Sequence, residues 1–66
     1  LQQYQKVIAD INQMESLGNP IDPILNNYRA SCYYMIGDKN NAKVFFQKAA
    51  SEGNADAQKN LNSLTF

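Results

Sequence analysis

The positions of glycine and of helix-capping residues constrain this 66-residue chain more than any other feature. Its glycines are Gly18, Gly37 and Gly53, and each is followed closely by an aspartate or asparagine. Glycine readily adopts the left-handed conformation that ends a helix, whereas Asp and Asn side chains accept hydrogen bonds from the first N–H groups of the next helix. The expected caps are Asp22, Asp38 and Asn54. The pattern therefore predicts helices over about 1–17, 23–36, 39–52 and from 55 onward.

Apolar residues recur at helical spacing within each of these stretches. The predicted buried positions are Tyr4, Val7, Ile8, Ile11 and Met14 or Glu15; Leu25, Tyr28, Cys32, Tyr33 and Ile36; Ala42, Phe45, Phe46, Ala49 and Ala50; and Ala57, Leu61 and Leu64, with Phe66 folding back over the end. No stretch alternates with the period of a strand. Connections of about two to five residues make consecutive helices antiparallel. We therefore expect an all-α fold of about four helices, paired as hairpins.

Composition and charge disfavour several classes of function. The chain has one cysteine, Cys32, and no histidine, which argues against a disulfide framework and against the usual zinc sites. Its six basic and six acidic residues are scattered, so no footprint for nucleic acid is visible. No apolar run approaches the roughly 18 residues that span a bilayer. We expect no catalytic residue, no metal and no cofactor, no nucleic-acid partner and no membrane insertion, with Cys32 acting as a small buried apolar residue.

The first residue is leucine rather than methionine, and no signal-peptide pattern follows it. We expect the chain to be a trimmed piece of a longer protein. Its compartment is left open by the sequence.

Residues around the second and third predicted helices carry a family resemblance. Tyr33, Ala42 and Phe46 stand at the spacing of an aromatic, a small residue and an aromatic in the tetratricopeptide repeat, and Ala30 and Ala49 extend its line of small residues. The stretch from 48 to 61, KAASEGNADAQKNL, is similar to Sel1-like repeats. Two positions depart from the pattern, with Asn26 where a large aromatic is common and Arg29 where leucine is usual. The chain thus resembles the end of a tetratricopeptide-like array.

The resemblance implies a short α-solenoid in one domain, 1–66. Residues 1–18 would be a helix of a preceding repeat, residues 21–53 a complete hairpin repeat, and residues 54–66 a capping helix. It also implies a non-catalytic module that binds a peptide or protein segment on the concave face of the array. The residues implied for that face are Ile24, Asn27, Ser31, Tyr34 and Met35. We expect the other asparagines and glutamines to lie on solvated helix faces and turns.

Two alternatives stay open. The chain could be a self-associating structural element, a homo-oligomer that pairs through Tyr4, Val7 and Ile11 on the first helix. It could also read nucleic acid in the manner of pentatricopeptide repeats, which the balanced charge disfavours. Concentration-dependent sedimentation separates the first alternative from a monomeric binding module.

Overall fold

The computed structural model describes residues 2–66, and within that range the chain forms four α-helices and no strand. They are α1 (Gln2–Ser16), α2 (Pro23–Met35), α3 (Lys39–Ser51) and α4 (Ala55–Ser63). The prediction of an all-α fold with about four helices is confirmed. Leu1, where the first helix was expected to begin, lies outside the described residues.

Each of the last three helices begins at the predicted cap. Asp22 accepts a hydrogen bond from the Leu25 N–H at 2.7 Å, and Asp38 accepts one from the Asn41 N–H at 3.2 Å. Asn54 accepts one from the Ala57 N–H at 2.8 Å. These bonds satisfy N–H groups that have no partner inside their own helix. The helix starts are therefore determined locally.

Each of the first three helices ends at the predicted glycine. Gly18, Gly37 and Gly53 all have positive φ, between 88° and 100°. At the last corner the Gly53 N–H donates to the Ala50 carbonyl and the Asn54 N–H to the Ala49 carbonyl, both at 3.0 Å. Equivalent bonds occur at the other two corners, and this pair of bonds defines the Schellman motif. The backbone N–H of Asn54 thus caps the end of α3, and its side chain caps the start of α4. A very short connection is therefore enough to reverse the chain direction.

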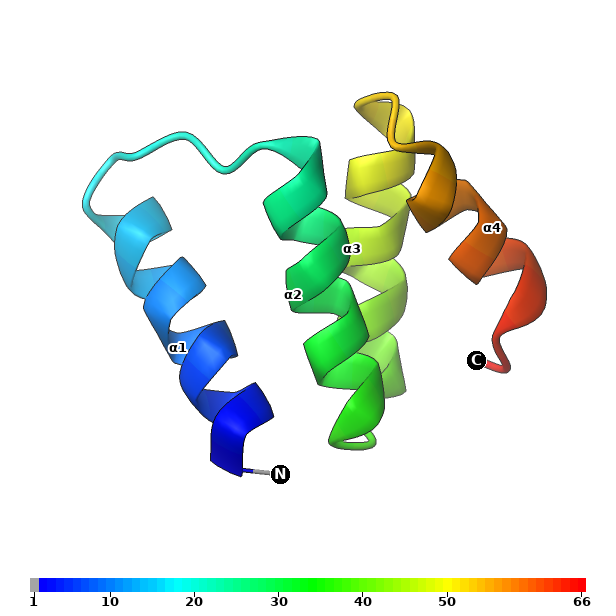
Figure 1. The fold of residues 1–66 in the computed structure, drawn as a ribbon, viewed down its shortest axis with the longest axis horizontal. Coiled ribbons are helices and arrows are strands. Elements are labelled where there is room, and N and C mark those ends of the chain that lie inside the picture. The colour runs from blue at the N-terminus through cyan, green and yellow to red at the C-terminus, as the bar shows by residue number, and fades with distance from the viewer. Residues whose placement is uncertain (1) are drawn as a thin grey trace.

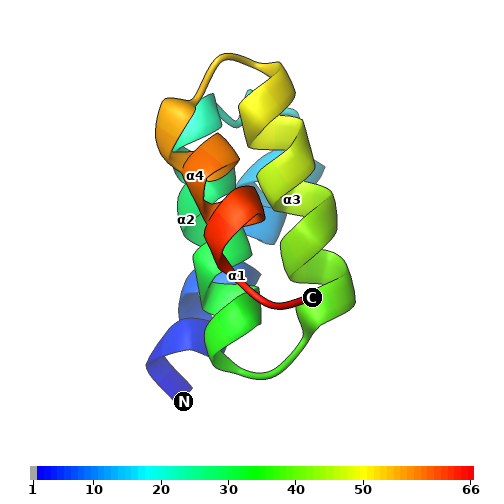
Figure 2. The same cartoon turned by 90° about the vertical axis from the view of Figure 1, so that its right-hand side faces the viewer.

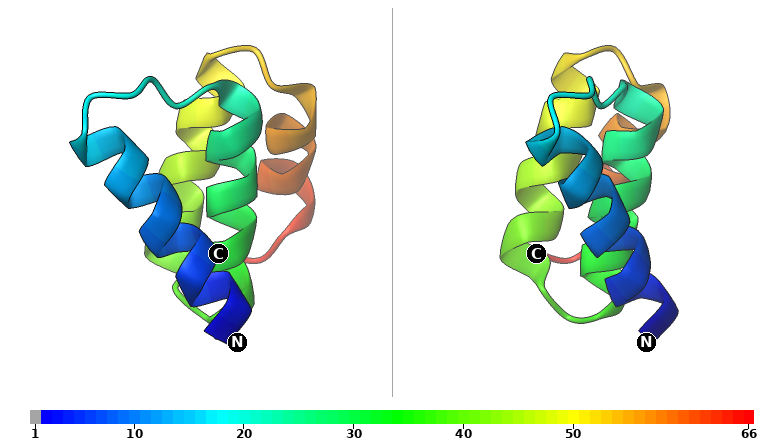
Figure 3. Two further views of the ribbon diagram at one scale, coloured as in Figure 1. Left: turned by 60° about the vertical axis from the view of Figure 1, so that its left-hand side comes forward. Right: turned by 90° about the vertical axis from the view of Figure 1, so that its left-hand side faces the viewer.

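The helices lie side by side and alternate in direction (Figure 1). The molecule measures 31 × 26 × 15 Å. α2 and α3 form the central hairpin. α4 lies in front of this hairpin when it is viewed from one side (Figure 2), and α1 lies in front of it from the opposite side (Figure 3).

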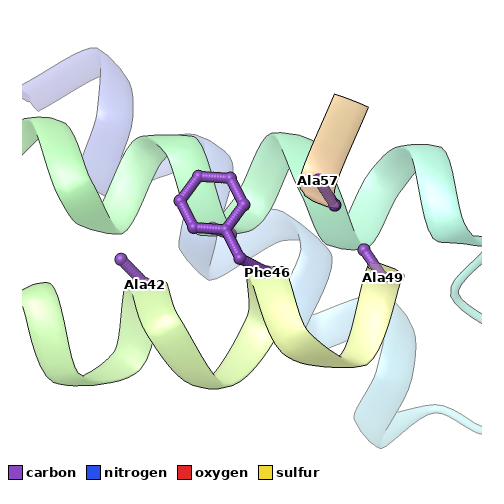
Figure 4. Packing of buried hydrophobic residues seen from close by; sticks show 5 residues of the cluster. Ala42, Phe46, Ala49 and Ala57 are labelled. Atoms are coloured by element: carbon purple, nitrogen blue, oxygen red, sulfur yellow. The ribbon is translucent and has the colours of Figure 1, made fainter. Parts of the chain in front are cut away.

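The contiguous apolar core lies between α2, α3 and α4. It consists of Phe46 and four alanines, all fully buried (Figure 4). The alanines are Ala30, Ala42, Ala49 and Ala57. Small residues allow helix backbones to approach closely, and the one large ring fills the space that remains between them. The predicted packing role of these residues is confirmed, and Phe66 does fold back, with its ring 6.0 Å from the Phe46 ring.

The buried side of α2 differs from the predicted one. Tyr28, expected in the apolar stripe, is 51% exposed, whereas Asn26 and Arg29 are fully buried. The prediction was wrong at Tyr28 and wrong for Asn26, which was expected in solvent. The reason is that α1 and α3 both pack on α2. The part of the α2 surface that they cover is wider than the apolar stripe of α2 and is not centred on it. Polar side chains inside that part are buried together with the apolar ones.

The Gly53 corner yields a first testable outcome. A Cβ added at Gly53 would meet no atom within 4 Å, so an alanine there suffers only from the positive φ. We expect Gly53→Ala to lower the free energy of unfolding by about 1 kcal/mol, and Gly53→Asn by less, since asparagine tolerates this conformation better. Urea denaturation followed by circular dichroism measures both. An asparagine variant less stable than the alanine variant would contradict the conformational explanation.

Candidate interaction surface

An exposed apolar stripe runs along α2. Ile24, Tyr28 and Met35 expose 71%, 51% and 54% of their surface, and the half-buried Ser31 lies between Tyr28 and Met35 along the helix. These four residues recur at helical spacing and so share one side of the helix, here called the α2 outer face. None of them carries a charge at neutral pH. The tyrosine offers a ring with a polar tip, and methionine offers a flexible thioether, both of which suit contact with another chain.

The structure divides the five residues that were expected to line the binding face. Ile24, Ser31 and Met35 belong to the α2 outer face. Asn27 and Tyr34 instead turn toward the C-terminal part of the chain: Asn60 donates a hydrogen bond to Asn27 Oδ1 at 3.2 Å.

The Phe66 ring meets the ring of Tyr34 edge-on, with 5.7 Å between the ring centroids. The Ser31 hydroxyl donates to the Asn27 carbonyl of its own helix. Sequence reasoning missed Tyr28 as an exposed residue, although its place one turn after Ile24 was a usable signal.

The face of α1 considered for self-association is turned inward. Ile11 is only 4% exposed, and Tyr4 and Val7 are half-buried. Within the described chain this face is therefore covered at Ile11 and partly exposed at Tyr4 and Val7. The large apolar side chains that α1 and the residue after it do expose are Met14 and Leu17.

A polar cluster built around the buried side chains of Asn26 and Arg29 joins α1, α2 and the end of α3, and is here called the Arg29 network. Its members are Asn12, Glu15, Asn26, Arg29 and Glu52. Arg29 Nη1 donates to Asn12 Oδ1 at 2.7 Å and to Glu15 Oε1 at 3.0 Å, while Nη2 donates to Asn26 Oδ1 at 2.7 Å. Asn26 Nδ2 in turn donates to Glu52 Oε1 at 3.0 Å. The guanidinium thus has acceptors on α1 and on α2, which offsets much of the cost of burying its charge.

Aromatic rings support the same guanidinium. Arg29 Cζ lies 3.9 Å from the centroid of the Phe45 ring, close enough for a cation–π contact. The Phe45 ring stacks on Tyr33, with centroids 5.6 Å apart and planes 7° from parallel. Asn12 Nδ2 reaches the Tyr33 hydroxyl at 3.4 Å. Arg29 Nε is buried with no hydrogen-bond partner among the described atoms. The guanidinium is therefore held both at its edge and on its face.

Electrostatic effects follow from this geometry. The hydrogen bond from Arg29 holds the pKa of Glu15 below its usual value, and the positive charges of Arg29 and Lys48 act in the same direction. The Glu15 side chain is 44% exposed, so water screens part of this effect. Burial raises the pKa of the Cys32 thiol, which keeps it protonated and poorly nucleophilic.

Neither a protein-family model, nor a curated protein, nor a solved structure matches this chain. Within residues 2–66 no enclosed pocket is found, and no three His, Cys, Asp or Glu side chains gather as a metal site would require. No helix of that range combines the length and apolar character that crossing a membrane requires. The α2 outer face is therefore the candidate site on which a functional argument can be built.

Arginine at position 29 should not be replaceable by lysine. A lysine ammonium cannot reproduce the planar fork that reaches Asn12, Glu15 and Asn26 together, nor the stacking on Phe45. We expect Arg29→Lys to lower the free energy of unfolding by about 2 kcal/mol. The reverse exchange at an exposed site, Lys43→Arg, is the control and should change it by less than about 0.5 kcal/mol. Equal effects of the two variants in urea denaturation would refute the role of the fork.

The lowered pKa of Glu15 gives a pH dependence with a definite sign. The unfolded chain binds its proton below about pH 4.3, whereas the folded chain resists protonation until lower pH. The stabilisation by Glu15 is therefore complete above that value and is lost as the pH falls through the folded pKa. Chemical denaturation between pH 7 and pH 2.5 should show a smaller loss of stability for Glu15→Gln than for the wild type. Parallel curves for the two proteins would contradict the assignment.

Proposed function

We propose that this chain is a non-catalytic protein-binding module, the terminal portion of a tetratricopeptide-like helical repeat scaffold. A peptide or protein segment would bind along the α2 outer face. The observation that carries the proposal is the exposure of Ile24, Tyr28 and Met35 on one side of a single helix. Contiguous apolar side chains on the surface of a small protein favour a role in binding.

The corner geometry supports the solenoid part of the proposal. Gly37 and Gly53 close successive helices with the same pair of backbone bonds, and Asp38 and Asn54 then open the next helices. A corner that is repeated with so few residues can stack helical hairpins at a regular angle. Further repeats before α1 would extend the same arrangement and lengthen the binding face.

The chemistry of the α2 outer face indicates what kind of segment it would take. With no charged residue on the stripe, binding would depend on apolar contact and on hydrogen bonds through the Tyr28 hydroxyl. Aromatic and aliphatic anchors on the ligand would suit such a surface. Binding should therefore vary little with ionic strength, in contrast to recognition of nucleic acid.

A selected peptide tests the proposal. Peptides would be selected from a random displayed library against the immobilised chain, and the best binder measured by fluorescence anisotropy. We expect Tyr28→Asp to weaken binding at least about tenfold, because a charge then occupies the centre of an apolar contact. Val44→Asp on α3 is the matched control, since Val44 is 54% exposed and also lies within a helix.

The control should bind within about twofold of the wild type, as expected for a surface change away from the contact. Equal losses for the two variants would refute a site on α2. Failure to select any binder, together with dimers in sedimentation equilibrium, would favour self-association.

A further inference from the structure

Helix α1 is attached to the molecule differently from the other helices. The contiguous apolar core draws its residues from α2, α3 and α4, and none from α1. The fully buried apolar side chains that α1 contributes are Ile8 and Ile11. The remaining described contacts between α1 and the hairpin include the hydrogen bonds of Asn12 and Glu15 with Arg29 and of Asn12 with Tyr33. Polar contacts therefore contribute more to the attachment of α1 to the hairpin than to the attachment of α4.

Some members of the Arg29 network belong to the α2–α3 hairpin, and the others belong to α1. Asn26 and Phe45 hold the guanidinium from the hairpin side and belong to α2 and α3 themselves. Asn12 and Glu15 are the acceptors on the α1 side, and Glu15 is partly open to water. If α1 moved away, Arg29 would keep its contacts with Asn26 and Phe45, and water would replace the acceptors on α1.

We propose that the Arg29 network is a latch, at which α1 releases from the α2–α3 hairpin as a unit while the apolar core of α2, α3 and α4 stays folded. Local opening of this kind is expected for an element that contributes no residue to the contiguous apolar core, as is the case for α1. The opened molecule would expose the side of α2 that carries Arg29, a surface distinct from the α2 outer face.

The charges around Glu15 determine when the latch opens. Arg29 faces it from α2, Lys48 from α3, and Glu52, just after α3, bonds to Asn26 on the far side of the guanidinium. Protonation of Glu15 removes the negative charge that holds Arg29 from the α1 side. The latch is therefore closed at neutral pH and opens increasingly as the pH falls through the pKa of Glu15.

The single cysteine of the chain reports the opening. Cys32 is 1% exposed and lies three residues after Arg29, on the side of α2 that α1 covers. Release of α1 would uncover the thiol, whereas the core around Phe46 would stay closed. The rate of Cys32 modification and the hydrogen exchange of the Phe46 amide thus distinguish local opening from unfolding of the whole molecule.

The experiment measures modification of Cys32 by 4,4′-dithiodipyridine at pH 7, relative to free cysteine, in the full chain. We expect Glu15→Gln to accelerate it about fivefold or more, as for the loss of about 1 kcal/mol of docking energy. Asp10→Asn makes the same chemical change at an exposed site on α1 and should stay within about twofold of the wild type. In all three proteins the equilibrium constant of opening obtained from Cys32 modification should exceed the one obtained from exchange of the Phe46 amide, because α1 release uncovers Cys32 and only global unfolding exposes Phe46.

Two results would overturn the latch. One is equal modification rates in Glu15→Gln and Asp10→Asn. The other is an opening constant for Cys32 no larger than that for the Phe46 amide, since the whole molecule then opens together. If Glu15→Gln does not fold, the wild type between pH 7 and pH 3.5 provides the same test. There, Cys32 modification relative to free cysteine must rise as the pH falls, and the opening constant for Cys32 must stay above the one for the Phe46 amide corrected for its intrinsic rate.

Discussion

The close approach of α2 and α3 around Phe46 is the contact on which the rest of the structure depends. Alanines at positions 30, 42 and 49 bring the two backbones together, and the fully buried Phe46 ring fills the space that they leave. Ala57 then lets α4 pack on the same ring from the other side. A chain this short buries little surface, so one well-filled contact carries much of its stability. The positions of α1, of α4 and of the α2 outer face are all set relative to this hairpin.

Two kinds of packing meet on the two sides of the hairpin. On the α4 side the contact is mainly apolar, and the Phe66 ring lies edge-on to the rings of both Tyr34 and Phe46. On the α1 side a buried arginine replaces the leucine that the repeat pattern leads one to expect. The Arg29–Glu15 pair joins a buried guanidinium to a partly exposed carboxylate, and such a pair contributes little net stability while it demands one particular arrangement of partners. Helix α2 thus meets α1 and the C-terminal part of the chain through different chemistry, while Ile24, Tyr28 and Met35 stay exposed.

Much of the fold could be predicted from short stretches of sequence, because the signals are local. The helix starts at Asp22, Asp38 and Asn54 and the ends at Gly18, Gly37 and Gly53 depend on residues within one helical turn. The buried face of α3 was also predictable, since most of its apolar residues lie on one side and recur at helical spacing. The candidate site was predicted in part: Ile24, Ser31 and Met35 lie on the α2 outer face, Asn27 and Tyr34 turn toward α4 and the C-terminal residues, and Tyr28 was missed.

The sequence by itself determined where each helix begins and ends and that neighbouring helices run antiparallel, because caps, glycines and short connections act over a few residues. Only the tertiary structure decided which side of α2 is buried. That side depends on where α1 docks, and the α1 residues that contact Arg29 lie 14 and 17 positions before it along the chain. The same long-range contact explains Asn26 and Arg29, which look misplaced in a repeat pattern. Arg29 is accommodated inside the fold because folding brings two acceptors, Asn12 and Glu15, from another helix, and Asn26 supplies a third.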